Sequence, residues 1–178
     1  MSALWAVRHA PVRAVGLCYG RADVETSLDA DAAAAQVLAF GTWSIGQVWS
    51  SPSARCRGPA AVIAARLGVG LHIDERLFEL DFGAWEGRSW EKLGRDEPGA
   101  LHHWANDWQR AAPPGGETVA QLEHRVRAWW SELPRGGDAL LFAHAGPVRA
   151  LRVIAGASWD EAMALPVPHL APHRFDRS

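Results

Sequence analysis

Short apolar segments alternate with helical patterns along this chain, and that alternation constrains the fold more than any other feature. Residues 4–7 form a short apolar run that stops at Arg8-His9, which is typical of a buried strand ending in a polar loop. Residues 139–143 give the strongest strand pattern and end at His144. Strands that alternate with helices predict an α/β fold with a mostly parallel, helix-covered central sheet.

The remaining elements follow from the same patterns. Further strands are expected at residues 47–50 and 71–73, and helices at 27–40, 53–67, 90–108 (broken near Pro98-Gly99), 117–133 and 148–154. Residues 158–178 are expected to add an edge strand near 163–165. The 178 residues contain no repeat or low-complexity tract, so we expect a single domain over 1–178.

Composition excludes several classes of protein. The formal net charge of -2 provides no basic field for nucleic acid, so any anion site must be built locally. Cys18 and Cys56 are too few for a disulfide scaffold and predict free thiols in a reducing compartment. The N-terminal apolar run lacks the basic flank of a signal peptide, and no run is long enough for a bilayer. We therefore expect a cytoplasmic protein without a membrane partner.

Two predicted strands end in histidine, which places His9 and His144 at the same sheet edge, where ligands of α/β proteins bind. The small residues Ala10 and Ala145-Gly146 follow them and let a bound group approach the backbone. Arg55 lies on the first turn of the helix that follows a third strand. Two arginines and two histidines converging in this way predict a cradle for a phosphate dianion.

Each of these residues also has a simpler interpretation. A lone histidine at a strand end is usually a polar boundary residue, and Arg55 alone is most often a solvated helix residue. The joint pattern favours a site because each member falls where the fold places one. No HxH or HExxH spacing is present, so we expect neither a metal nor a cofactor.

Five motifs resemble those of the histidine phosphatase superfamily, in the family's order. They are Arg8-His9-Ala10, Ser51-Pro52-Ser53-Ala54-Arg55, the segment from Glu79 to Gly87, Pro114-Gly115-Gly116-Glu117-Thr118, and His144-Ala145-Gly146. The resemblance implies a phosphoglycerate mutase-like fold, a three-layer α/β/α sandwich with a mostly parallel sheet. Two departures stand out: Ala10 replaces the signature glycine, and Pro11-Val12-Arg13 replaces residues that often contact substrate.

The resemblance also implies a mechanism. His9 is the implied nucleophile, and Glu79 is the implied proton donor to the leaving oxygen. Residues implied to hold the phosphoryl group or substrate are Arg8, Arg55, His144, Ala145, Tyr19, Gly20 and Ser51. Asp81 and Glu86 compete with Glu79 for the acid role, with Glu86 the stronger alternative, whereas Glu117 is expected to cap its helix.

Residues 18–23 and 77–87 are similar to the bacterial α-ribazole phosphatase branch of this family. That branch removes phosphate from α-ribazole 5′-phosphate late in cobalamin synthesis, so a small phosphate ester is the expected partner. A broad phosphomonoesterase on sugar phosphates or nucleotides is the first alternative. A phospholigand-binding protein without catalysis is the second, and a mutase is disfavoured because a short chain leaves little room for a long lid. A homodimer is left open.

Tryptophan is abundant, and its role is ambiguous in the sequence. Trp85, Trp90, Trp104 and Trp108 fall in the region that covers the site in this family. Their spacing suits ordinary helix packing first and an aromatic pocket wall second.

Overall fold

The computed structural model describes residues 2–177, which form a five-stranded sheet with the order β3-β2-β4-β1-β5. The strands are β1 (Ser2–Arg8), β2 (Ile45–Ser50), β3 (Gly70–Ile73), β4 (Asp138–Ala143) and β5 (Pro172–Arg177). The first four are parallel, and β5 pairs antiparallel with β1. This arrangement confirms the predicted α/β class with its mostly parallel central sheet.

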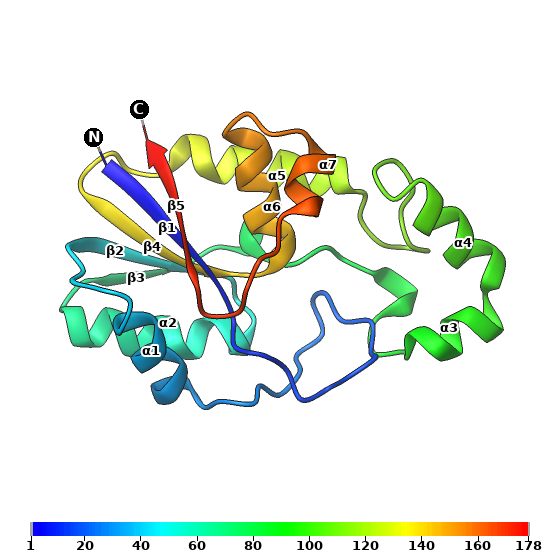
Figure 1. Cartoon of the computed structure of the whole chain (residues 1–178), viewed down its shortest axis with the longest axis horizontal. Coiled ribbons are helices and arrows are strands. Elements are labelled where there is room, and N and C mark those ends of the chain that lie inside the picture. The colour runs from blue at the N-terminus through cyan, green and yellow to red at the C-terminus, as the bar shows by residue number, and fades with distance from the viewer. Residues whose placement is uncertain (1, 178) are drawn as a thin grey trace.

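Helices cover both faces of the sheet (Figure 1). α1 (Ala30–Leu38) and α2 (Ala54–Leu67) lie on one face, while α5 (Val119–Glu132) and α6 (Ala145–Ile154) lie on the other. The central strand β4 serves both cores because side chains alternate along a strand. Leu140 and Phe142 pack with α1 and α2, whereas Leu141 packs with α5 and α6.

A segment between β3 and α5 projects away from this sandwich (Figure 1). It contains two 3-10 turns, Glu75–Leu77 and Gly83–Trp85, and the helices α3 (Trp90–Asp96) and α4 (Pro98–Asn106). The break expected near Pro98 therefore falls at Glu97. Trp85 and Leu93 are fully buried beside Cys18, so the segment has a small core of its own.

Helix starts differ from the sequence expectation where capping chemistry decides them. Glu117 does not cap α5, because Thr118 is the N-cap and forms a capping box with Gln121. Glu117 instead pairs with Arg125, whose Nε lies 2.7 Å from the carboxylate. α1 begins at Ala30 because the carboxylate of Asp29 accepts the Ala32 N–H.

The expectation of an edge strand near residues 163–165 is wrong. Ser158 and Glu161 form a capping box, and this starts the helix α7 (Trp159–Ala164). The added edge strand is β5, further along the chain. α6 also begins three residues earlier than expected, directly after His144. Within residues 2–177, none of the helices has the length and apolar character needed to cross a bilayer.

Candidate active site

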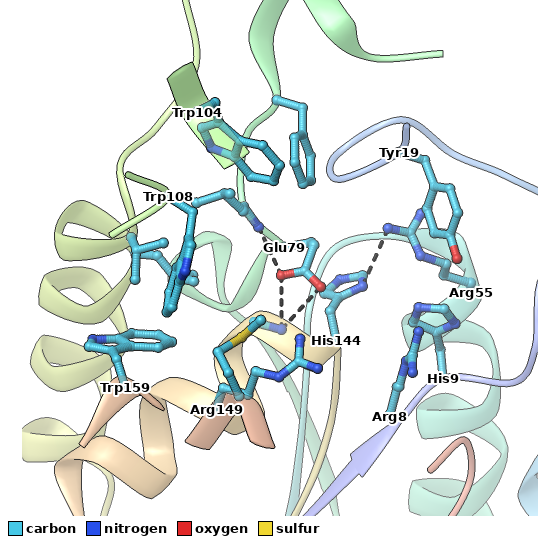
Figure 2. A pocket seen from close by; sticks show the side chains of 16 residues that line it. Arg8, His9, Tyr19, Arg55, Glu79, Trp104, Trp108, His144, Arg149 and Trp159 are labelled. Carbon is cyan, nitrogen blue, oxygen red and sulfur yellow. Dashed lines mark hydrogen bonds between the residues drawn. The ribbon is translucent and has the colours of Figure 1, made fainter. Parts of the chain in front are cut away.

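The predicted histidines and arginines meet at the carboxyl edge of the sheet. The register pairs Arg8 with Ala143 and Ser50 with Phe142, so the residues that follow β1, β2 and β4 emerge together. A pocket of about 240 Å³ opens there. Its lining includes the sequence candidates Arg8, His9, Tyr19, Arg55, Glu79 and His144 (Figure 2).

His9 has the arrangement of a neutral nucleophile. Its Nδ1 lies 2.7 Å from the Ala10 carbonyl oxygen, and a carbonyl only accepts, so Nδ1 carries the proton and Nε2 keeps its lone pair. The ring is only 2% exposed. Burial, with smaller contributions from Arg55 and Arg8, lowers the pKa of His9 to about 3. His9 is therefore uncharged at neutral pH.

His144 is held by hydrogen bonds to two neighbours. Its Nδ1 lies 3.3 Å from Arg55 Nη2, which only donates, and its Nε2 lies 2.8 Å from Ser51 Oγ. Burial and the nearby Arg55 hold the pKa of His144 well below its usual value. Ser51, an implied substrate contact, is fully buried and absent from the pocket lining, so it orients His144.

Arg55 is fixed by the loop that follows Cys18. Its guanidinium donates to the carbonyl oxygens of Ala22 at 2.7 Å and Gly20 at 2.5 Å, and it lies 5.5 Å from the Tyr19 ring centroid. Gly20 does not line the pocket. A Cβ on Gly20 would lie 1.8 Å from the Leu80 carbonyl oxygen, so a glycine is needed for close packing there.

The two glutamates that compete for the acid role occupy different environments. Glu86 accepts the backbone N–H groups of Gly20, Arg21, Ala22 and Phe82 at 2.9 to 3.1 Å and is absent from the pocket lining. Asp81 likewise lies outside the lining and accepts the Gly83 N–H at 2.8 Å. Only Glu79 of these three carboxylates reaches the pocket.

Glu79 rests on the N-terminus of α6 (Figure 2). Its two oxygens accept the Gly146 N–H at 3.0 and 3.1 Å, and Oε1 also accepts the Leu80 N–H at 2.9 Å. A Cβ on Gly146 would lie 2.0 Å from Oε1, so this approach requires a glycine. Ala145, an implied substrate contact, does not line the pocket, whereas its neighbour Gly146 does.

Arg8 completes the polar side of the pocket. Its Nη1 donates to the Val167 carbonyl at 3.0 Å. His169 was not anticipated from the sequence; its Nδ1 lies 2.6 Å from the His9 carbonyl oxygen, and its ring lies 5.4 Å from the His9 ring. His169 therefore helps to fix the end of β1, but it lies in a stretch that resembles no family motif.

The far side of the pocket is aromatic. Trp104 and Trp108 line it, while Trp85 is fully buried and Trp90 packs against Trp104 at 6.2 Å, so both interpretations of these tryptophans apply. Trp159, which the sequence did not single out, stands edge-on to Trp108 at 6.1 Å (Figure 2). We call Trp104, Trp108 and Trp159 the tryptophan wall.

Arg149 was also missed as a pocket residue. It lies three positions after Gly146 on α6, which places it on the same helix face as that glycine. This i, i+3 relation to a recognised motif was the available signal.

The other polar groups near the site behave as follows. Within residues 2–177, no group of three or more His, Cys, Asp or Glu side chains has a geometry suited to a metal ion.

Cys18 and Cys56 are both free and buried, which confirms the prediction of free thiols. The Cys56 thiol donates to the Ala143 carbonyl at 3.3 Å, beneath His144.

Comparison with known proteins gives a family and several relatives. Residues 4–175 match the family described as the histidine phosphatase superfamily (branch 1). A curated relative from Salmonella choleraesuis named "Probable phosphoglycerate mutase GpmB" is 36% identical over 104 residues, which cover 57% of this chain and 48% of that protein. The chain thus spans about half the length of that relative.

Two solved structures superpose closely. The α-ribazole phosphatase from Shigella flexneri gives a TM-score of 0.88 at 24% identity, covering 99% of this chain and 91% of that chain. A mycobacterial glucosyl-3-phosphoglycerate phosphatase gives a TM-score of 0.83 at 24% identity, covering 97% and 89%. At these identities both structures establish the fold alone.

Proposed function

Since this chain belongs to the histidine phosphatase superfamily (branch 1), we propose that it hydrolyses phosphate monoesters through a phosphohistidine formed on His9. The observation that carries the proposal is the neutral His9 ring, whose Nδ1 donates to the Ala10 carbonyl oxygen and whose Nε2 keeps its lone pair, in a pocket lined by three arginines and one carboxylate. Phosphoryl transfer requires mainly positioning and charge stabilisation, and this arrangement supplies both.

The reaction proceeds in two displacements. His9 Nε2 attacks phosphorus, the ester P–O bond breaks, and Glu79 gives its proton to the leaving alcohol oxygen. Water then attacks the phosphohistidine, Glu79 takes a proton from it, and the P–N bond breaks to release phosphate. Arg8 and Arg55 bind the nonbridging oxygens and stabilise the charge that spreads over them, and His144 orients Arg55 by accepting a hydrogen bond from its guanidinium.

The proposed substrate is α-ribazole 5′-phosphate, which gives α-ribazole and phosphate in cobalamin biosynthesis. Two features support this ester: the polar end of the pocket suits a phosphate, and the tryptophan wall suits a planar base at the other end. The α-ribazole phosphatase from Shigella flexneri has the same fold as this chain.

A broad phosphatase on sugar phosphates or nucleotides is the second candidate. Its support is that the groups proposed to bind and transfer phosphate all line the polar end of the pocket and do not depend on the aromatic side. Turnover of α-ribazole 5′-phosphate, sugar phosphates and nucleotides at equal protein concentration separates the two. A kcat/KM for α-ribazole 5′-phosphate at least tenfold above the others supports the first, and equal values support the second.

Acid-quenched labelling tests the chemistry. We expect an acid-labile phosphoenzyme in the wild type, none in His9→Ala, and an unchanged amount in His103→Ala, whose side chain is exposed on α4. Label that persists in His9→Ala would exclude His9 as the nucleophile. The absence of label and turnover in the wild type would instead favour a phospholigand-binding protein.

A further inference from the structure

Arg149 is a third arginine in the pocket, and it has no role in the proposed reaction. It comes from α6, and Figure 2 places its guanidinium between the Arg8 and His9 side of the pocket and the side formed by Trp108 and Trp159. The other two pocket arginines donate to backbone carbonyls of the protein. Within residues 2–177, the Arg149 guanidinium has no hydrogen-bond acceptor and no ion-pair partner.

This unpaired state is unfavourable for a guanidinium that is partly removed from water. The side chain is half-buried, and its Nε is shielded from solvent without an acceptor. Burial lowers the pKa of Arg149, and Arg8 adds to the lowering while Glu79 opposes it. Buried donors in proteins are normally paired, so a ligand that enters the pocket can supply the acceptor that the Arg149 Nε lacks.

The position of Arg149 indicates which part of a ligand it meets. The proposed acid Glu79 must contact the oxygen that links phosphorus to the leaving group. The phosphoryl group lies on the His9 side of that oxygen, and the leaving group extends the other way, toward the tryptophan wall. Arg149 lines the pocket at that boundary (Figure 2).

We propose that Arg149 is a specificity-determining residue that donates hydrogen bonds to oxygen atoms of the leaving group next to the ester bond. This inference rests on the proposed phosphomonoesterase function of the pocket. The acceptors are either neutral sugar oxygens or a carboxylate, and both offer lone pairs to a planar guanidinium. Together with the tryptophan wall, Arg149 selects a leaving group that is polar near phosphorus and planar beyond it.

Binding in a His9→Ala background tests this without turnover. Calorimetry compares ribose 5-phosphate (neutral oxygens), 3-phosphoglycerate (a carboxylate) and phenyl phosphate, which has no acceptor beyond the ester itself. Arg149→Met is the test variant, and Arg149→Lys keeps the charge with fewer donors. Arg66→Met is the matched control because Arg66 pairs with Asp31 on the opposite face of the sheet.

We expect Arg149→Met to weaken binding of at least one oxygen-bearing ester by about 10- to 100-fold more than binding of phenyl phosphate, as expected for losing a charge-assisted hydrogen bond. The ester with the larger loss identifies the acceptor as neutral oxygen or carboxylate. Arg149→Lys should recover part of the loss, and Arg66→Met should leave the ratios unchanged.

Two results would overturn the inference. An equal loss for all three esters and for inorganic phosphate would place Arg149 on the phosphoryl group, and unchanged ratios would leave it without a ligand role. Failure of the wild-type chain to hydrolyse any ester refutes the proposed function, whereas the binding ratios are measured independently of turnover.

Discussion

Glu86 anchors the loop that carries Arg55, so replacing it with glutamine should reduce stability more than it changes the chemistry. The Glu86 carboxylate accepts four backbone N–H groups, three of them from residues 20–22. The carbonyl oxygens of Gly20 and Ala22 in turn hold the Arg55 guanidinium. The amide of glutamine keeps one acceptor oxygen and turns a donor toward the other N–H groups.

The magnitude follows from the contacts that are lost. In the wild type, the Ala22 N–H lies 3.1 Å from Glu86 Oε2. If the glutamine oxygen takes the Oε1 position, this N–H loses its acceptor. The other N–H groups then donate to a neutral amide oxygen and not to a carboxylate. Hydrogen bonds to charged groups contribute about 1.5–3 kcal/mol each, so Glu86→Gln should cost about 2–4 kcal/mol. For a chain of this size that lowers Tm by roughly 5–15 °C.

Glu79→Gln is the matched comparison, since Glu79 accepts only the N–H groups of Gly146 and Leu80. We expect a small change in Tm and a loss of about 10²–10⁴ in kcat on alkyl phosphates. The loss should shrink on p-nitrophenyl phosphate, whose leaving group needs no proton. The measurements are the Tm of each variant from thermal unfolding and its kcat on alkyl phosphates and on p-nitrophenyl phosphate. If Glu86→Gln unfolds like the wild type yet shows this dependence on leaving group, the assignment of the two glutamates is reversed.

Three further predictions concern the histidines, the wall and the thiols. Folding lowers the pKa values of His9 and His144 from near 6.5, to about 3 for His9. Below about pH 6.5 the unfolded chain therefore binds protons that the folded chain does not. The free energy of unfolding is full above about pH 6.5 and falls below it by about 1.4 kcal/mol per pH unit for each of the two histidines. Urea unfolding from neutral pH to about pH 5 should show this fall, and His9→Asn should have a shallower slope; equal slopes would contradict the assignment. Trp159→Ala should raise KM for an aromatic ester about 2- to 10-fold more than for ribose 5-phosphate, because it removes one ring of the wall, and equal changes would argue against stacking. Burial raises the pKa of Cys18 to about 12 and that of Cys56 still further, so a thiol reagent should label both only after unfolding; rapid labelling of the native protein would refute their burial.

The site was predicted in outline because its residues are tied to strand ends. Arg8, His9 and His144 follow apolar runs, and Arg55 opens a helix whose boundary was expected within one residue. The family predicted from the five motifs is confirmed. The strand predicted in the C-terminal region was wrong. The helix α7 forms there because Ser158 starts a capping box, and the pattern of apolar residues does not reveal that box.

The sequence by itself determined the α/β class, the family and the set of polar residues at one sheet edge, because periodicity and motif spacing are local properties of the chain. Only the tertiary structure decided which of those residues line the pocket and which hold other residues in place. Ser51 and Gly20 are implied substrate contacts, but Ser51 hydrogen-bonds to His144 and the Gly20 carbonyl accepts from Arg55. The Glu86 carboxylate accepts backbone N–H groups. Arg149 and Trp159 join the pocket from α6 and α7, since side chains far apart in sequence converge only when those helices pack together beside the pocket. Convergence of this kind is set by packing across the whole fold, which no single segment encodes.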